Sequence, residues 1–288
     1  MTAVFRREVG AYFKGVLGYL LSAFLLVFAG IYCMAYNLSG YYANFEYVLS
    51  AIGFIYLIAV PIISMRTVAE EKRQKTDQLL YSLPIHLSDV VIGKYLAMLV
   101  VLAVPCLIMA TYPLILSQFG DFSYATAYGA LIAFFMMGAC LLSIGLFISS
   151  VTESQVAAAV ITLVTMLLLY FMSSLSSYVS TDSSASLTAL SVLVLIFAAV
   201  VYMLTKNPIV AVIVGVLGVG GLQLWYQSDS SAFYGLFAEM LNSISVFDRF
   251  NTFVDGVFDL TAIVYYLSII VVFLFLTVQA LEKKRWGE

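Results

Sequence analysis

The chain has 288 residues, 63% of them hydrophobic and only 10% charged, with a mean hydropathy of +1.05 and a net charge of −3. Because soluble domains carry about 25% charged residues, this composition excludes an ordinary soluble domain and predicts an integral membrane protein. The small net charge indicates no particular partner, since the distribution of charge along a chain matters more than its sum.

Uncharged windows of near-spanning length recur along the whole sequence. A hydrocarbon core about 30 Å thick requires roughly 20 apolar residues in a helix, and eight windows without Asp, Glu, Lys, Arg or His approach or exceed that length. They cover residues 17–36, 47–65, 95–117, 124–150, 156–172, 187–204, 208–226 and 260–281. The predicted fold class is therefore all-α, an integral membrane bundle of about eight transmembrane helices that forms a single domain over residues 1–288.

The basic residues indicate how these helices cross the membrane. If the N-terminus is inside, twelve Lys and Arg residues fall in inner segments and only Arg249 falls in an outer one. Lys and Arg near span ends stay on the cytoplasmic side, so this bias predicts that both termini are cytoplasmic. We expect a multi-pass protein of the inner (cytoplasmic) membrane.

Residues 1–16 combine an apolar and a basic face. Phe5, Val9, Tyr12 and Phe13 recur at helical spacing, and the basic residues of this segment lie off that stripe. The pattern predicts a short helix lying in the cytoplasmic interface, with its apolar face towards the lipid. A basic flank that only sets the orientation is the alternative.

The long polar interruption at residues 66–94 is predicted to contain a docking element. Its first part continues the second span as a charged helix, and a second short helix follows, with an N-terminal cap, an apolar face of three leucines and a terminating proline. The residues of that second helix are Thr76, Asp77, Leu79, Leu80, Leu83 and Pro84. Such a helix suits insertion into a groove on a partner. A solvated loop is the alternative, although it would leave the leucines exposed.

Residues 187–226 read as a helical hairpin, because only a very short turn separates the sixth and seventh windows. Pro208 stands just after that turn, at a position suited to the first turn of a helix.

The outer segment 227–259 carries apolar residues at helical spacing, which predicts one or two amphipathic helices at or in the outer membrane surface. A gate and a lid that only covers the bundle are both compatible with this pattern. The residues proposed for an outer gate are Phe233, Phe237, Met240, Ile244 and Phe247.

Catalytic and cofactor motifs are missing. Glu70 and Glu71 superficially match the paired glutamates of intramembrane CAAX-type proteases, but such a site needs further ligands and His86 is the single histidine. The spans offer no carboxylate or histidine for a proton relay, and Gly93 with Lys94 lacks the rest of a phosphate-binding loop. We expect no enzyme activity, and no metal, cofactor or nucleic acid bound by this chain. If ATP powers the protein, a partner subunit holds the ATP and Mg²⁺.

Four stretches of sequence together resemble the ABC-2 type transporter permeases, particularly the gliding-motility-associated permease group. They are EEKRQKTDQLLYSLPI after the second span, SDVVIGKYLA entering the third, FRREVGAYFKGVLGYLLSAFLLVFAGIYCMAYN near the N-terminus and RFNTFVDGVFDLTAIVYYLSIIVVFLFLTVQALEKKRW near the C-terminus. The resemblance covers roughly residues 1–176 and 245–286. The hairpin 187–226 departs from the six-span core of that family, because it adds two spans before the last one.

The resemblance implies roles for particular residues. Residues 76–83 would be a coupling helix gripped by a separate ATP-binding cassette subunit, with Glu70, Glu71, Lys72 and Arg73 at its membrane-side base. The helix around residues 5–13 would be the interfacial connecting helix, and the segment before the last span would supply the outer gate helices.

The same resemblance implies an exporter that works as a homodimer or heterodimer of permeases, embedded in lipid, with two ATPase subunits. A stand-alone channel or sodium-coupled carrier is the alternative from the residues alone, and a membrane scaffold without transport is a third class.

Overall fold

A computed structural model describes residues 1–40, 42–75, 86–118, 120, 122–205 and 207–287. Helices dominate these residues, and none of the described residues lies in a strand. The predicted all-α class is confirmed. The chain divides into two compact units, of which unit 1 is Met1–Tyr170 with Val246–Glu288 and unit 2 is Phe171–Ser245.

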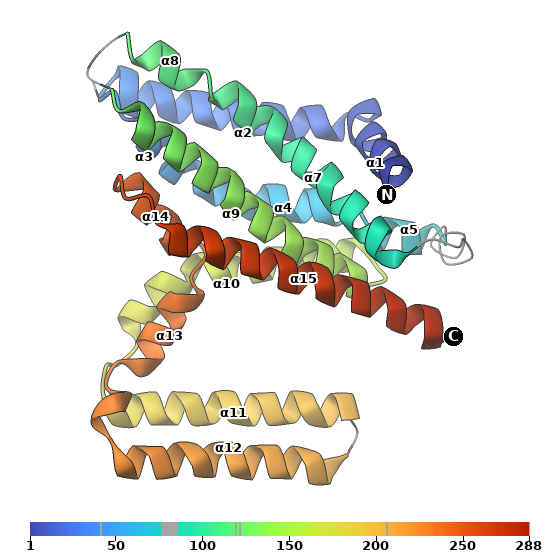
Figure 1. The fold of residues 1–288 in the computed structure, drawn as a ribbon, viewed down its shortest axis with the longest axis vertical. Coiled ribbons are helices and arrows are strands. Elements are labelled where there is room, and N and C mark those ends of the chain that lie inside the picture. The colour runs from blue at the N-terminus through green and yellow to red at the C-terminus, as the bar shows by residue number, and fades with distance from the viewer. Residues whose placement is uncertain (41, 76–85, 119, 121, 206, 288) are drawn as a thin grey trace. The chain divides into compact units, whose positions relative to one another are not determined.

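Unit 1 contains the helices of the first five predicted spans and of the last one (Figure 1). Its elements are α1 (Thr2–Lys14), α2 (Leu17–Tyr32), the π-helical turn Cys33–Leu38, α3 (Phe45–Ile52), the 3₁₀ turn Gly53–Ile55, α4 (Tyr56–Ser64), α5 (Ala69–Arg73), α7 (Leu87–Met109), α8 (Tyr112–Leu116), α9 (Tyr124–Val151), α10 (Gln155–Tyr178, which ends in unit 2), α14 (Asp248–Val254) and α15 (Leu260–Gly287).

Seven helical segments within the described part of the chain are long and apolar enough to cross a membrane. They match seven of the eight predicted windows, and the remaining window, 187–204, falls in α11 (Ser183–Thr205), whose described apolar stretch is the shorter Ser183–Ala199. The second span is interrupted rather than continuous, because the 3₁₀ turn Gly53–Ile55 separates α3 from α4.

Helix α9 is the most buried of these spans, and two glycines let its neighbours approach closely. A Cβ atom added at Gly138 would lie 2.6 Å from Leu102 Cδ2 and 2.7 Å from the Tyr56 hydroxyl oxygen. A Cβ atom added at Gly145 would lie 2.8 Å from Cβ of Ser64 on α4. Small residues at such crossings allow membrane helices to pack backbone against backbone.

Tyrosine hydroxyls hold α9 against the same neighbours. Tyr56 of α4 donates to the carbonyl of Phe134 at 3.0 Å, and Tyr95 of α7 donates to the carbonyl of Ala139 at 3.0 Å. A buried hydroxyl needs a partner in an apolar surrounding, so each tyrosine favours one register between its helix and α9. On its other side α9 lies along α15 (Figure 1).

Unit 2 contains α11, α12 (Pro208–Ser228), the 3₁₀ turn Ser231–Phe233 and α13 (Leu236–Ile244). Helices α11 and α12 pack side by side as the predicted hairpin (Figure 1). Pro208 is the first residue of α12, as predicted, and the side chain of Asn207 accepts a hydrogen bond from the amide of Ile209 at 3.0 Å. The outer segment also forms two short helices, α13 in unit 2 and α14 in unit 1.

Candidate functional site

Helices α5 and α7 precede and follow the predicted docking element in the chain. α5 ends at Arg73, and α7 begins at Leu87. The predicted residues between them, Thr76, Asp77, Leu79, Leu80, Leu83 and Pro84, lie outside the described residues. The candidate site therefore comprises the described helices next to this element in the chain.

A buried lysine lies between these helices and the N-terminal helix. Lys94 of α7 is only 2% exposed, and its ammonium group lies 3.1 Å from Glu8 of α1 and 2.9 Å from Glu71 of α5. The ammonium group also donates to the backbone carbonyl of Thr67 at 3.0 Å. A buried charge is tolerated only when it is paired and hydrogen-bonded, so this lysine stabilises the junction of α1, α5 and α7.

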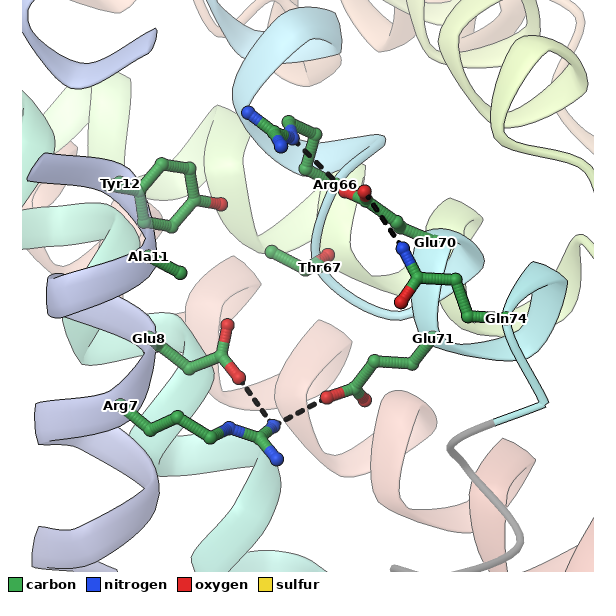
Figure 2. A pocket seen from close by; sticks show the side chains of 9 residues that line it. All are labelled: Arg7, Glu8, Ala11, Tyr12, Arg66, Thr67, Glu70, Glu71 and Gln74. Atoms are coloured by element: carbon green, nitrogen blue, oxygen red, sulfur yellow. Dashed lines mark hydrogen bonds and ion pairs between the residues drawn. The ribbon is translucent and has the colours of Figure 1, made fainter. Parts of the chain in front are cut away.

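Arg7 closes the arrangement from the exposed side. Its guanidinium group lies 2.6 Å from Glu8 and 2.5 Å from Glu71 (Figure 2). The hydrogen bond that Arg7 donates to Glu8 raises the pKa of Arg7 above its ordinary value. Two cations thus face two carboxylates, and we call Arg7, Glu8, Glu71 and Lys94 the ionic cluster. The cluster is neutral as a whole, which lowers the penalty for burying its members.

A pocket of about 330 Å³ opens beside the ionic cluster, between α1 and the segment that joins α4 to α5. Glu70 pairs there with Arg66 at 3.0 Å and accepts a hydrogen bond from Gln74 at 3.2 Å (Figure 2). The lining residues are Arg7, Glu8, Ala11, Tyr12, Arg66, Thr67, Glu70, Glu71 and Gln74. The carboxylates that the sequence singled out are therefore engaged in ion pairs.

The predicted interfacial residues lie on a helix that packs against the bundle. Tyr12 is buried, and its hydroxyl donates to the carbonyl of Ile63 at the end of α4, at 2.9 Å. Burial raises the pKa of this phenol well above its ordinary value, so it stays a protonated donor. Phe5, Val9 and Phe13 are half-buried.

The predicted coupling and gate residues fall in several places. Glu70, Glu71, Lys72 and Arg73 all belong to α5, where Glu71 joins the ionic cluster and Arg73 is exposed. Of the gate residues, Phe233 lies in the 3₁₀ turn of unit 2, and α13 carries Phe237, Met240 and Ile244. Phe247 lies in unit 1, with its ring 5.1 Å from that of Tyr170.

Sequence reasoning missed Glu8, Arg7 and Lys94 as members of one site. Val4, Glu8 and Tyr12 follow one another at helical i, i+4 spacing, so one face of α1 carries an acid among apolar residues. The position of Glu8 within a basic segment was the one sequence feature that could have indicated a buried ion pair. Among the described residues, no group of three His, Cys, Asp or Glu side chains could hold a metal ion.

Comparison with known proteins agrees with this architecture. A family model described as "ABC-2 family transporter protein" matches residues 29–285, which is most of the chain. No curated protein matches the sequence. The matched range includes the α5 and α7 sides of the ionic cluster and every span after the first. The chain therefore belongs to the ABC-2 family and is a multi-pass membrane permease of an ABC transporter.

Proposed function

We propose that this permease is an exporter of the gliding-motility-associated group, driven by a separate ATPase subunit that docks on residues 76–84. The observation that carries the proposal is the ionic cluster. It joins the two helices that flank residues 76–85 to each other and to α1 through ion pairs of the buried Lys94. Because α5 and α7 are anchored in this way, a displacement of residues 76–84 by a partner would move the helix bundle instead of bending the chain locally.

The sequence of the docking element supports a helix that fits a groove. In the sequence, Leu79, Leu80 and Leu83 are spaced to share one face of a helix, which we predict to begin near Thr76 and to end at Pro84. Helix-in-groove recognition uses such closely spaced apolar anchors. For the push to do work, the ATPase must hold this helix differently in its ATP-bound and ATP-free states, because a ligand shifts an equilibrium only by its differential affinity.

The complete transporter would contain two permease chains, identical or homologous, and two ATPase subunits that bind the ATP and Mg²⁺. Both termini and residues 66–94 would face the cytoplasm, since twelve of the thirteen Lys and Arg residues then lie inside. The direction of transport, export, follows from the resemblance to the gliding-motility-associated permeases. This chain would bind no cofactor of its own.

A charge placed on the apolar face of the docking element should release the ATPase. We expect Leu79→Asp or Leu80→Asp to reduce ATPase co-purification with the tagged permease by roughly 30-fold or more, because losing a buried anchor removes at least about 2 kcal/mol of binding free energy. Quantitative mass spectrometry of complexes from native membranes measures this. Ser88→Asp adds the same charge at an exposed position and should leave co-purification unchanged.

If the ATPase stays bound to both leucine variants at the wild-type level, residues 76–84 are not its docking site. If the wild-type chain transports without nucleotide and brings down no ATP-binding subunit, the chain is a carrier or channel that works alone.

A further inference from the structure

Helix α5 has no side-chain cap of its own, and α9 supplies one. The residue before α5 is Val68, which makes no side-chain cap hydrogen bond. Instead the hydroxyl oxygen of Ser149, a fully buried residue of α9, accepts hydrogen bonds from the amides of Ala69 at 3.0 Å and Val68 at 3.3 Å. Thr67 also donates to this oxygen at 3.3 Å. The first amides of a helix need acceptors, and here a distant helix provides the acceptor.

Helix α5 caps α9 in return. The ammonium group of Lys72 donates to the backbone carbonyls of Ser150 and Thr152, where α9 ends. A cation at a helix C-terminus satisfies carbonyls that lack intrahelical partners and interacts favourably with the helix dipole. We call Ser149 and Lys72 the reciprocal cap. It ties α5 to a helix that begins about fifty residues further along the chain, at Tyr124.

Helix α9 connects this cap to the other end of unit 1. At 1.5 Å per residue its 28 residues extend about 42 Å. Towards its N-terminal end the ring of Phe134 packs edge-to-face against that of Phe250 on α14, with centroids 6.0 Å apart. A Cβ atom added at Gly256, just after α14, would lie 3.2 Å from the Thr126 side chain. Helices α9 and α14 are therefore in direct contact.

We infer that Ser149 and Lys72 are positioning residues for energy coupling: they make α5 and α9 move as one body, so that movement of residues 76–84 reaches α14 through α9. The inference rests on the proposed function, because it requires an ATPase that moves that segment. The covalent neighbours of the segment are α5 and α7. The reciprocal cap connects a third helix, α9, to this segment through α5. Helix α9 in turn contacts α14, which belongs to the predicted outer segment.

The test uses the permease and ATPase complex in membranes, with a cysteine in place of Asp255 as reporter. Asp255 is exposed at the end of α14, and Cys33→Ser removes the half-buried native cysteine. The rate of reaction with a membrane-impermeant maleimide is measured from outside, with and without a non-hydrolysable ATP analogue. The variants are Ser149→Ala and Lys72→Met.

One matched control lies on α9 and the other lies just after the end of α5. Ser143 is a fully buried residue of α9, and its hydroxyl donates to Cys140 of its own helix at 2.6 Å. Lys75 is an exposed lysine two residues after the end of α5. Ser143→Ala and Lys75→Met should keep the wild-type nucleotide response. Ser149→Ala and Lys72→Met should reduce it by roughly five-fold or more, the lower range of allosteric couplings, while the ATPase stays bound and hydrolyses ATP.

Equal responses in the cap variants and their controls would overturn the inference, and so would a wild-type complex in which nucleotide leaves the reporter unchanged. In both cases a bound, active ATPase would leave the proposed function standing. Absence of an ATP-binding partner from the wild-type chain would overturn both.

Discussion

Lys94→Met should lower the free energy of unfolding by about 3 kcal/mol, the loss expected when one member of a buried ion pair is removed. The substitution leaves Glu8 and Glu71 facing Arg7 alone, so the ionic cluster keeps one uncompensated negative charge in a buried site. For a chain of this size the thermal midpoint in detergent should fall by roughly 6–12 °C. Thermal unfolding of the purified permease measures the change.

Two further variants separate the charge from the loss of side-chain volume. Lys284→Met removes an ammonium group that is 36% exposed and pairs with the exposed Glu153 at 3.3 Å, so it should shift the midpoint little. Lys94→Met combined with Glu71→Gln restores a neutral cluster and should be more stable than Lys94→Met alone. Equal losses for Lys94→Met and Lys284→Met, or no recovery in the double variant, would contradict a charge-balanced junction.

Gly145→Ala should destabilise the bundle by about 2 kcal/mol, the typical effect of overpacking a filled core. The new methyl group would lie 2.8 Å from Cβ and from the hydroxyl oxygen of Ser64, and 3.3 Å from Cγ1 of Val60. Cβ of Ser64 is fixed to the backbone of α4, so the clash can be relieved only by moving α4 away from α9. The free energy of unfolding and the yield of monodisperse protein should both fall.

Removing the side chain on the opposite side of the interface provides the control. Ser64→Gly removes the two closest atoms that the new methyl group meets and leaves the 3.3 Å contact with Cγ1 of Val60, so Gly145→Ala with Ser64→Gly should recover most of the lost stability. Gly30→Ala on α2, where an added Cβ meets nothing within 4 Å, should be neutral or slightly stabilising. If the double variant is no better than Gly145→Ala, the close crossing of α4 and α9 is not what limits stability.

Local properties of the sequence predicted most of the fold. Apolar length depends on neighbouring residues only, and the windows 124–150, 156–172 and 208–226 fall within α9, α10 and α12 with ends that differ by a few residues. The break between α3 and α4 was missed because Gly53–Ile55 is as apolar as the rest of the span. The break is a change of backbone conformation from α-helix to a 3₁₀ turn, and hydropathy does not report backbone conformation.

The ionic cluster could not be predicted in the same way, because tertiary packing assembles it. Lys94 and Glu8 are 86 positions apart in the chain. They meet because α1 packs onto α7 at Gly93, where an added Cβ would lie 3.3 Å from Val4. From sequence alone, Lys94 only marked the start of the third span. Its burial against two carboxylates depends on the position of a helix that hydropathy treats as a flank.

Photo-cross-linking from the docking element tests the central claim most directly. A photoreactive amino acid in place of Leu80 is activated in intact cells, and mass spectrometry identifies the cross-linked polypeptide. A probe in place of Asp182, which lies between the fifth and sixth predicted windows, is the control. We predict that the probe at position 80 captures an ATP-binding cassette subunit and the control does not. Capture of lipid, or only of polypeptides that bind no ATP, would contradict an ATP-driven permease that receives its energy through residues 76–84.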